Sequence, residues 1–159
     1  MEPLTQVDNP LREKALAYLA NHNVMTLATS GPEGLWAAAV FYVNDGFTLH
    51  FLSAPTTRHS QNIAVQPGVA VTIQEDYKDW PEIKGIQLEG KARRIEGDEQ
   101  AAAIARYGQK FPIVGNLDKA PVEIARAMSK IAWYKITPER LYFIDNSLGL
   151  GHRDEVMLN

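Results

Sequence analysis

The chain has 159 residues, of which 45% are hydrophobic, 9% aromatic and 22% charged, a composition typical of a globular protein. It has no cysteine, which excludes disulfides, zinc–cysteine sites, iron–sulfur clusters and thiolate nucleophiles. The net charge of −3 argues against a nucleic-acid partner, and no apolar run approaches the roughly 18 residues of a membrane span.

The first third of the chain predicts one helix followed by two hairpins. Asn9 can cap a helix that begins at Pro10, and apolar residues recur at helical spacing as far as His22. Strands are expected over residues 24–29, 35–43 and 47–53. The second of these is apolar on both faces, so we expect both faces to be covered. Asn44-Asp45-Gly46 is a strong hairpin signal.

The rest of the chain predicts more strands than helices. Helices are expected over 56–65, 98–110 and 120–130, and strands over 69–74, 83–95, 131–137 and 140–144. Pro138-Glu139 separates the last two strands, residues 111–118 are expected to be irregular, and Ile104 and Tyr107 are placed on the inner side of their helix. Strands with few helices between them indicate a mainly β fold, an antiparallel barrel or sandwich with flanking helices. We expect a single domain over residues 1–159, without a signal peptide and located in the cytoplasm.

Standard catalytic and metal-binding patterns are absent from the sequence. There is no phosphate loop and no serine between glycines, and Gly149-Leu150-Gly151 does not continue as a dinucleotide fingerprint. The four histidines, at 22, 50, 59 and 152, lack the close spacing of metal ligands. We therefore predict no protein metal site and name no catalytic residue.

Residues 53–62, Ser-Ala-Pro-Thr-Thr-Arg-His-Ser-Gln-Asn, lead from a strand into a helix. Unpaired amides at a helix start favour an anion, and Ser53 and Thr57 add hydroxyl donors. Arg58 supplies a planar fork suited to phosphate, and His59 offers another donor. We interpret this segment as a phosphate site. The alternative is a capped surface helix with solvated Arg58 and His59.

Two strands predict a slot for a planar ring. Residues 35–42 contain three consecutive alanines, which form strands poorly and suggest that a flat group presses against the backbone. The alternative is tight packing against another element. In the strand at 83–95, Gly85 permits close backbone approach and Gln87 offers an amide.

In this order, the segments resemble the FMN-binding split-barrel family, which includes the pyridoxamine phosphate oxidases. The resemblance covers residues 10–97. It rests on Leu-Ser-x-Pro-Thr-Thr-Arg-His-x-x-Asn-Ile at 52–63, on Gln-Pro-Gly-Val-Ala-Val at 66–71 and on Ile-Gln-Leu-x-Gly-Lys-Ala-Arg-Arg-Ile at 86–95. The ending Ile-Asp-Asn-Ser-Leu-Gly-Leu-Gly at 144–151 is similar to a subgroup of small bacterial split-barrel proteins.

The resemblance implies an antiparallel split barrel and a homodimer with two FMN sites at its subunit interface. It implies three groups of FMN-binding residues: Ser53, Thr57, Arg58 and His59 at the phosphate, Ala39, Val40 and Phe41 along the isoalloxazine ring, and Lys84, Gly85 and Gln87 at the ring edge. In the oxidases, lysine commonly stands at the position of His59. The arginine and histidine residues with which those enzymes hold their substrate have no counterpart in residues 133–159.

The leading functional hypothesis is an FMN-dependent oxidoreductase acting on an unidentified small substrate. Because the chain has no cysteine, the bound flavin would have to carry the electrons. Two alternatives stay open: a flavin or haem-type binding protein without turnover, and a dimeric interaction protein whose turn at 53–59 is only a helix cap.

Overall fold

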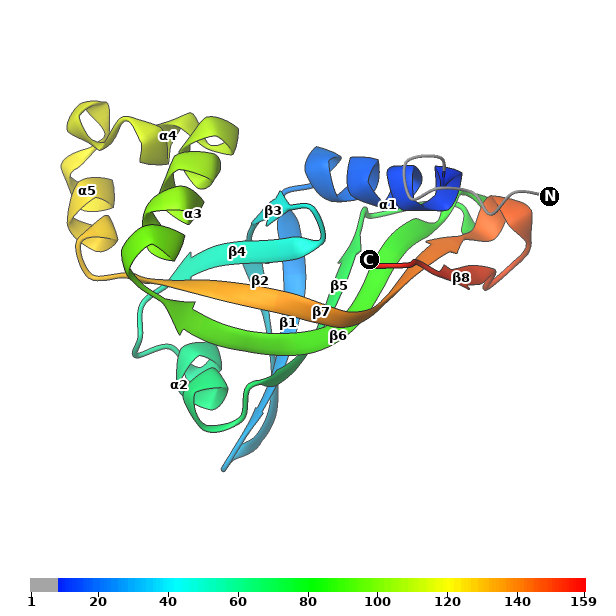
Figure 1. Ribbon diagram of the computed structural model, residues 1–159, viewed down its shortest axis with the longest axis horizontal. Coiled ribbons are helices and arrows are strands. Elements are labelled where there is room, and N and C mark those ends of the chain that lie inside the picture. The colour runs from blue at the N-terminus through cyan, green and yellow to red at the C-terminus, as the bar shows by residue number, and fades with distance from the viewer. Residues whose placement is uncertain (1–8) are drawn as a thin grey trace.

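An antiparallel sheet of eight strands forms the centre of the computed structural model, which describes residues 9–159. The strands are β1 (Val24–Gly31), β2 (Gly34–Phe41), β3 (Val43–Asp45), β4 (Thr48–Ser53), β5 (Gly68–Gln74), β6 (Lys84–Ile95), β7 (Ala132–Asp145) and β8 (Arg153–Glu155). Neighbouring strands follow the order β2-β1-β5-β6-β7-β4-β3, and β8 pairs with β7. The sheet curls into a half-barrel with helices around it (Figure 1). This arrangement confirms the mainly β, split-barrel fold.

Within residues 9–159, five helices flank the sheet. They are α1 (Pro10–Asn21), α2 (Arg58–Val65), α3 (Gly97–Lys110), α4 (Pro112–Gly115) and α5 (Val122–Met128), with short 3₁₀ turns at Trp80–Glu82, Leu117–Lys119 and Asn146–Leu148. As predicted, Asn9 caps α1, because its side-chain oxygen accepts hydrogen bonds from the amides of Leu11 and Arg12. In Figure 1, α3, α4 and α5 gather at one end of the sheet, and α2 lies on its other side.

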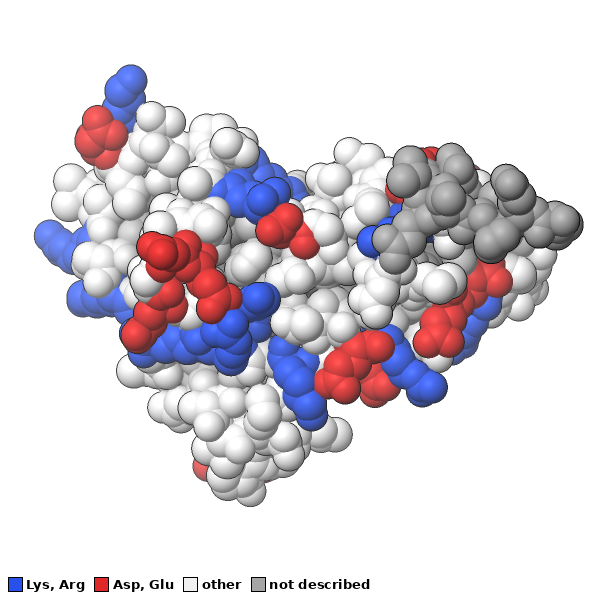
Figure 2. Space-filling view, in the orientation of Figure 1, with Lys and Arg blue, Asp and Glu red and all other residues white. Residues whose placement is uncertain are grey.

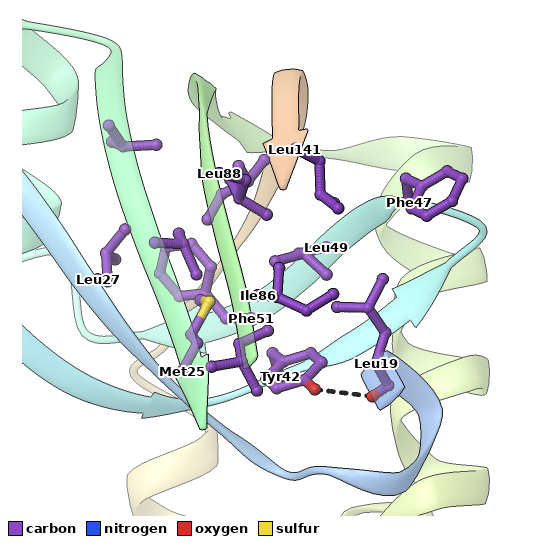
Figure 3. Packing of buried hydrophobic residues seen from close by; sticks show 14 of the residues in the cluster. Leu19, Met25, Leu27, Tyr42, Phe47, Leu49, Phe51, Ile86, Leu88 and Leu141 are labelled. Carbon is purple, nitrogen blue, oxygen red and sulfur yellow. Dashed lines mark hydrogen bonds between the residues drawn. The ribbon is translucent and has the colours of Figure 1, made fainter. Parts of the chain in front are cut away.

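The main core fills the inside of the half-barrel. Strand β1 shows how it is built, since Met25 and Leu27 are fully buried while Thr26 between them faces outward. Figure 3 shows Leu19 of α1 packed near Tyr42, whose hydroxyl donates a 2.7 Å hydrogen bond to the Leu19 carbonyl oxygen. This buried bond ties α1 to the end of β2.

A second core lies outside the barrel, between α3 and the sheet. Ala103 and Tyr107 of α3 are buried there against Trp133 of β7. Tyr107 thus confirms its predicted inner position, but Ile104 is 37% exposed, because the buried stripe follows the four-residue spacing of positions 103 and 107. The segment 111–118, expected to be irregular, instead contains α4 and a 3₁₀ turn.

Strand β7 runs through Pro138, so the predicted break into two strands is wrong. A bulge absorbs the proline: Gly90 of β6 pairs with Pro138, Glu89 pairs with Arg140, and Glu139 has no partner in the ladder. The backbones approach so closely that a Cβ on Gly90 would lie 2.9 Å from the Pro138 Cα. Gly90 therefore has no room for a side chain at this position.

Strand β2 forms one edge of the sheet, and within one chain its faces are largely open. Leu35 is 82% exposed and Phe41 is 55% exposed. The prediction that both faces are covered therefore does not hold within one chain. The β1–β2 hairpin projects beyond α2 at the bottom of Figure 1.

Candidate cofactor site

Thr57 anchors the turn that leads from β4 into α2. Its hydroxyl oxygen accepts a hydrogen bond from the Ser60 amide at 3.3 Å and lies 3.0 Å from the Ala54 carbonyl oxygen. It also lies 2.8 Å from the Ser60 hydroxyl. These contacts make Thr57 the N-cap of α2, so its hydroxyl is used within the protein.

Ser53 and His59 join the end of β4 to the first turn of α2. The Ser53 hydroxyl lies 2.7 Å from His59 Nε2, and both residues are buried. Burial lowers the pKa of His59, so its imidazole is neutral at physiological pH. A neutral, internally bonded histidine supports the turn rather than adding positive charge to it.

Arg58 is the charged group of the turn, and it reaches across to the start of β2. Its guanidinium lies over the Trp36 ring, 4.5 Å from the centroid, and one terminal nitrogen is 3.2 Å from the Glu33 carbonyl oxygen. Its buried Nε has no hydrogen-bond partner, and no carboxylate of residues 9–159 pairs with it. The positive charge is therefore not neutralised by an acidic side chain of the described protein.

Asn62 fixes α2 against the β1–β2 hairpin. Its side-chain nitrogen donates a 3.0 Å hydrogen bond to the Thr29 hydroxyl, and a Cβ on Gly31 would lie only 2.7 Å from Asn62 Cγ. Sequence reasoning overlooked both Asn62 and Trp36. Asn62 stands in the same segment as Arg58, one helical turn later, whereas the contact of Trp36 depends on strand pairing and has no local signal.

Strand register places the predicted ring residues on the outer face of the sheet. Ala39 pairs with Thr26, Thr26 with Thr72 and Thr72 with Gln87, and directly paired residues share a face. This row spans three strand spacings, or about 14 Å. Val40 points to the opposite face and packs against the barrel core, so only its backbone adjoins the outer face.

The outer face carries small side chains, and we define it by Ala28, Ala37, Ala39, Ala70, Thr26 and Thr72. A hollow of about 370 Å³ opens on it, lined in part by Ala28, Leu35 and Ala70. A second, smaller hollow of about 170 Å³ is lined in part by Lys84, Gly85 and Gln87. The alanine-rich stretch of β2 is therefore open rather than covered by another element of the same chain.

The ten predicted residues form two groups. Arg58 contacts the Leu35 carbonyl oxygen, four residues or about 13 Å along β2 from Ala39. Its guanidinium lies over Trp36, whose side chain is on the face of β2 opposite Ala39. Lys84, Gly85 and Gln87 lie on β6, on the far side of β1 and β5. Within one chain, the structure does not bring these β6 residues into contact with the Arg58 turn.

The buried histidines predict a stability that falls in mild acid. Burial lowers the pKa of both His50 and His59, so the unfolded chain binds more protons than the folded one below pH 6.5. Going from pH 7.5 to 5.5 should therefore reduce the free energy of unfolding, by at most about 1.4 kcal/mol per histidine. Urea unfolding of the wild type and His59→Gln at both pH values measures this. We expect the stability of His59→Gln to change less between the two pH values than that of the wild type. Equal stability of the wild type at both pH values would contradict the prediction.

Residues 9–159 hold no group of three or more histidine, aspartate or glutamate side chains placed to bind a metal ion. None of the helices in that range is long and apolar enough to cross a membrane. On the face shown in Figure 2, acidic and basic side chains are interspersed, with no broad basic patch.

Comparison with known proteins agrees with the geometry. A family model described as pyridoxamine 5'-phosphate oxidase matches residues 11–145. A UPF0306 protein of Klebsiella pneumoniae is 36% identical over 138 residues, 86% of each chain. A haem-binding protein from Mycobacterium smegmatis has a TM-score of 0.73 at 25% identity, and the match covers 99% of this chain but 60% of that one.

The haem storage protein HutZ of Vibrio cholerae matches with a TM-score of 0.66 at 20% identity, over 82% of this chain and 92% of that one. At this identity the likeness shows the shared fold alone. The family match, the close relatives and the half-barrel agree with the resemblance noted in the sequence. The chain belongs to the pyridoxamine 5'-phosphate oxidase family and, within it, to the UPF0306 proteins.

Proposed function

We propose that this protein binds FMN between two copies of the chain and acts as a flavin-dependent oxidoreductase on a small substrate. The observation that carries the proposal is the edge strand β2, which Arg58 contacts at Leu35 and which presents Ala37 and Ala39 on the open outer face. Arg58 pairs with no carboxylate of residues 9–159.

The phosphate end of the site fits Arg58 best. The guanidinium has one long contact to each of two carbonyl oxygens and an unpartnered Nε, so its donors are poorly used within the chain. A charge-assisted hydrogen bond to phosphate would be stronger than these contacts. The Ser53 hydroxyl is within hydrogen-bond distance of both Thr57 and His59, and the role of these three residues is to hold the turn that presents Arg58.

The ring end fits the outer face, where Ala37 and Ala39 leave room for a planar group against β2. Exposed apolar side chains, Val24, Leu35 and Phe41, surround this region, and an open apolar surface of this kind favours a partner. A second copy packed on the same face would cover these side chains. It would also bring its own Lys84, Gly85 and Gln87 over the first copy's β2.

Each group of residues contacts a different part of FMN, and the proposal assigns no protein acid or base. Bound FMN supplies the electron-transfer chemistry. Arg58 holds the phosphate, the alanines of β2 allow close contact with the ring, and Gln87 offers an amide donor and acceptor to the ring edge. The flat slot, closed by the second copy, would exclude water from the ring.

Cofactor binding and turnover are tested separately. Purified protein should carry a yellow flavin that mass analysis identifies as FMN, and FMN at a hundredfold excess over its dissociation constant should stabilise the fold by roughly 2.7 kcal/mol. Multiple turnovers of NADH or NADPH oxidation by the FMN-loaded protein support the oxidoreductase. A colourless protein with no thermal shift would refute FMN binding, and binding without turnover would refute the enzyme.

Co-expression of two variants that bind FMN weakly tests whether Gln87 of β6 contacts the FMN bound to the partner subunit. Arg58→Ala and Gln87→Ala should each bind FMN weakly alone. Co-expressed, they form mixed dimers in which one site has both residues intact, so about a quarter of all sites should recover. If Gln87 served the site of its own chain, no mixed dimer would hold an intact site. Absence of recovery in isolated mixed dimers would therefore contradict the shared site.

Haem binding is the second candidate, and one contact favours it. His152 Nε2 lies 2.8 Å from Asp154 Oδ2, and the imidazole is partly exposed. A carboxylate that orients a histidine is a common arrangement behind metal-bound imidazole. Titration with haemin should then give a saturable Soret change that His152→Ala abolishes and Gln61→Ala leaves intact. A spectrum unchanged by haemin would remove this candidate.

A further inference from the structure

A hollow of about 420 Å³ lies between α2 and the inner side of β6 and β7 (Figure 1). Ala92 of β6 and Tyr134 of β7 border it, and both belong to the main core. Pro55 and Pro67, which flank α2, and the exposed Ala64 of the helix border it as well. The Ala92 amide donates a 2.9 Å hydrogen bond to the Pro67 carbonyl oxygen, which fixes the segment after α2 against β6. The walls of the hollow are therefore largely apolar and held in place by the backbone.

Tyr134 contributes a buried hydroxyl that has no partner in the described chain. The residue is only 4% exposed, and its ring stacks on Phe51 with the centroids 5.1 Å apart, so the ring is fixed in place. Within residues 9–159, tyrosine hydroxyls make hydrogen bonds at Tyr18, Tyr42 and Tyr77, and Tyr134 makes none. A buried tyrosine hydroxyl usually has a partner. This one is available to donate to a group inside the hollow.

Arg94 is the second donor, and it stands directly beside Tyr134. The two residues are paired across β6 and β7, so their side chains share a face with Cβ atoms about 4.5–5.5 Å apart. Arg94 Nε lies 3.9 Å from Glu96 Oε1, which is beyond hydrogen-bond distance, and both side chains are more than half exposed. Such a pair contributes little and leaves the guanidinium available.

The charges around the hollow favour an anion. Arg93 also borders it, but its guanidinium is already held by Glu99 at 2.8 and 2.9 Å. None of the carboxylates in residues 9–159 borders the hollow. The wall therefore offers two donors on paired residues, Arg94 and Tyr134, with no acid among the lining side chains to occupy them.

We propose that this hollow binds a small aromatic carboxylate, with one carboxylate oxygen on Arg94, the other on the Tyr134 hydroxyl, and the ring against the two prolines and Ala64. A carboxylate has two acceptor oxygens, which matches two neighbouring donors. An inorganic anion would leave the apolar walls in contact with water, whereas an aromatic ring covers them. The volume of about 420 Å³ falls in the range of small-molecule sites, roughly 300–1,000 Å³.

The test is calorimetric titration with 2-naphthoate at constant ionic strength, beside its uncharged isostere 2-naphthamide. We expect saturable binding of naphthoate with half-saturation at about 0.1–1 mM, as suits a ligand of this size. The amide should bind about three- to tenfold more weakly, because it keeps the ring but loses the charge-assisted contact. Equal binding of the two ligands, within twofold, would overturn the proposal.

Arg94→Gln should weaken naphthoate about three- to tenfold and leave naphthamide unchanged, so the preference for the charged ligand disappears. Arg140→Gln is the matched control, because Arg140 is also more than half exposed and lies 4.0 Å from its acidic partner Glu155. It should bind both ligands as the wild type does. The same loss of naphthoate affinity in both variants would show a general effect of surface charge and refute the assigned site.

Two further variants test the position of the ligand. Tyr134→Phe keeps the ring on Phe51 and removes only the hydroxyl, so it should fold as the wild type does and bind naphthoate at least threefold more weakly. Ala64→Leu, at an exposed helix position, should weaken both ligands at least tenfold by filling the hollow. Undiminished binding in Ala64→Leu would place the ligand elsewhere.

Saturating FMN separates this hollow from the flavin region. Arg58 contacts the start of β2, and no residue of β2 borders the hollow within the described chain. Naphthoate should therefore bind equally well with and without FMN. Loss of naphthoate binding on addition of FMN would overturn the proposal, whereas a protein that does not bind FMN would leave naphthoate binding as expected.

Discussion

Arg58→Ala is expected to weaken FMN binding roughly 10- to 150-fold, the loss of one charge-assisted phosphate contact. The side chain is the one cation of the turn at 53–59, and it pairs with no carboxylate of residues 9–159. Fluorescence titration of FMN against apoprotein measures the change. Arg58→Lys keeps the charge without the planar fork, so its affinity should fall between those of the wild type and Arg58→Ala.

Arg126→Ala is the matched control, because it removes an exposed arginine from α5. It should bind FMN as the wild type does. Arg58 also lies over Trp36, so thermal unfolding of each apoprotein must accompany the titration, with a cost of about 0.5–1 kcal/mol for the lost cation–π contact. Unchanged FMN affinity in a folded Arg58→Ala would show that the phosphate lies elsewhere.

Gly90→Ala is expected to reduce the free energy of unfolding by about 2–3 kcal/mol, as overpacking of a tight contact does. The new Cβ would meet backbone atoms, the Thr137 carbonyl oxygen and Pro138 Cα, and no side-chain rotation can relieve the clash. For a chain of this size, the melting temperature should fall by roughly 4–10 °C. Calorimetry of the apoprotein measures the shift.

Gly68→Ala provides the control on the neighbouring strand. A Cβ there meets only side-chain atoms at 3.6 and 3.7 Å, which is ordinary van der Waals contact. Its stability should stay within about 0.5 kcal/mol of the wild type. If Gly90→Ala proved equally harmless, the close approach of β6 and β7 at the bulge would be refuted.

Local sequence signals predicted most helices and strands, because helix caps and tight turns depend on neighbouring residues alone. Asn9 caps α1 as expected, and Gly46, at a φ of 58°, forms the predicted turn between β3 and β4. Pro138 misled the prediction because the missing amide is tolerated only through a bulge and a glycine on another strand, about 50 residues away. Such compensation leaves no trace in the segment that contains the proline.

The candidate site was likewise predicted only in part from the sequence. The composition of residues 53–62 pointed to an anion, and Arg58 does have donors to spare. The segment could not show that Ser53, Thr57 and His59 satisfy one another, because whether a polar group is free depends on its three-dimensional neighbours. The support of Arg58 by Trp36 likewise depends on how β2 meets α2.

The absence of cysteine determined that no protein thiol can carry redox chemistry, so that a bound cofactor would have to supply it. The modest net charge determined that the positive potential for a phosphate would have to be local. The order of motifs determined the family. Only the tertiary structure decided that the alanines of β2 lie open on a sheet edge and that Gln87 stands about 14 Å across the same face. The physical reason is that strand order and register arise from long-range pairing, which local residue patterns do not encode.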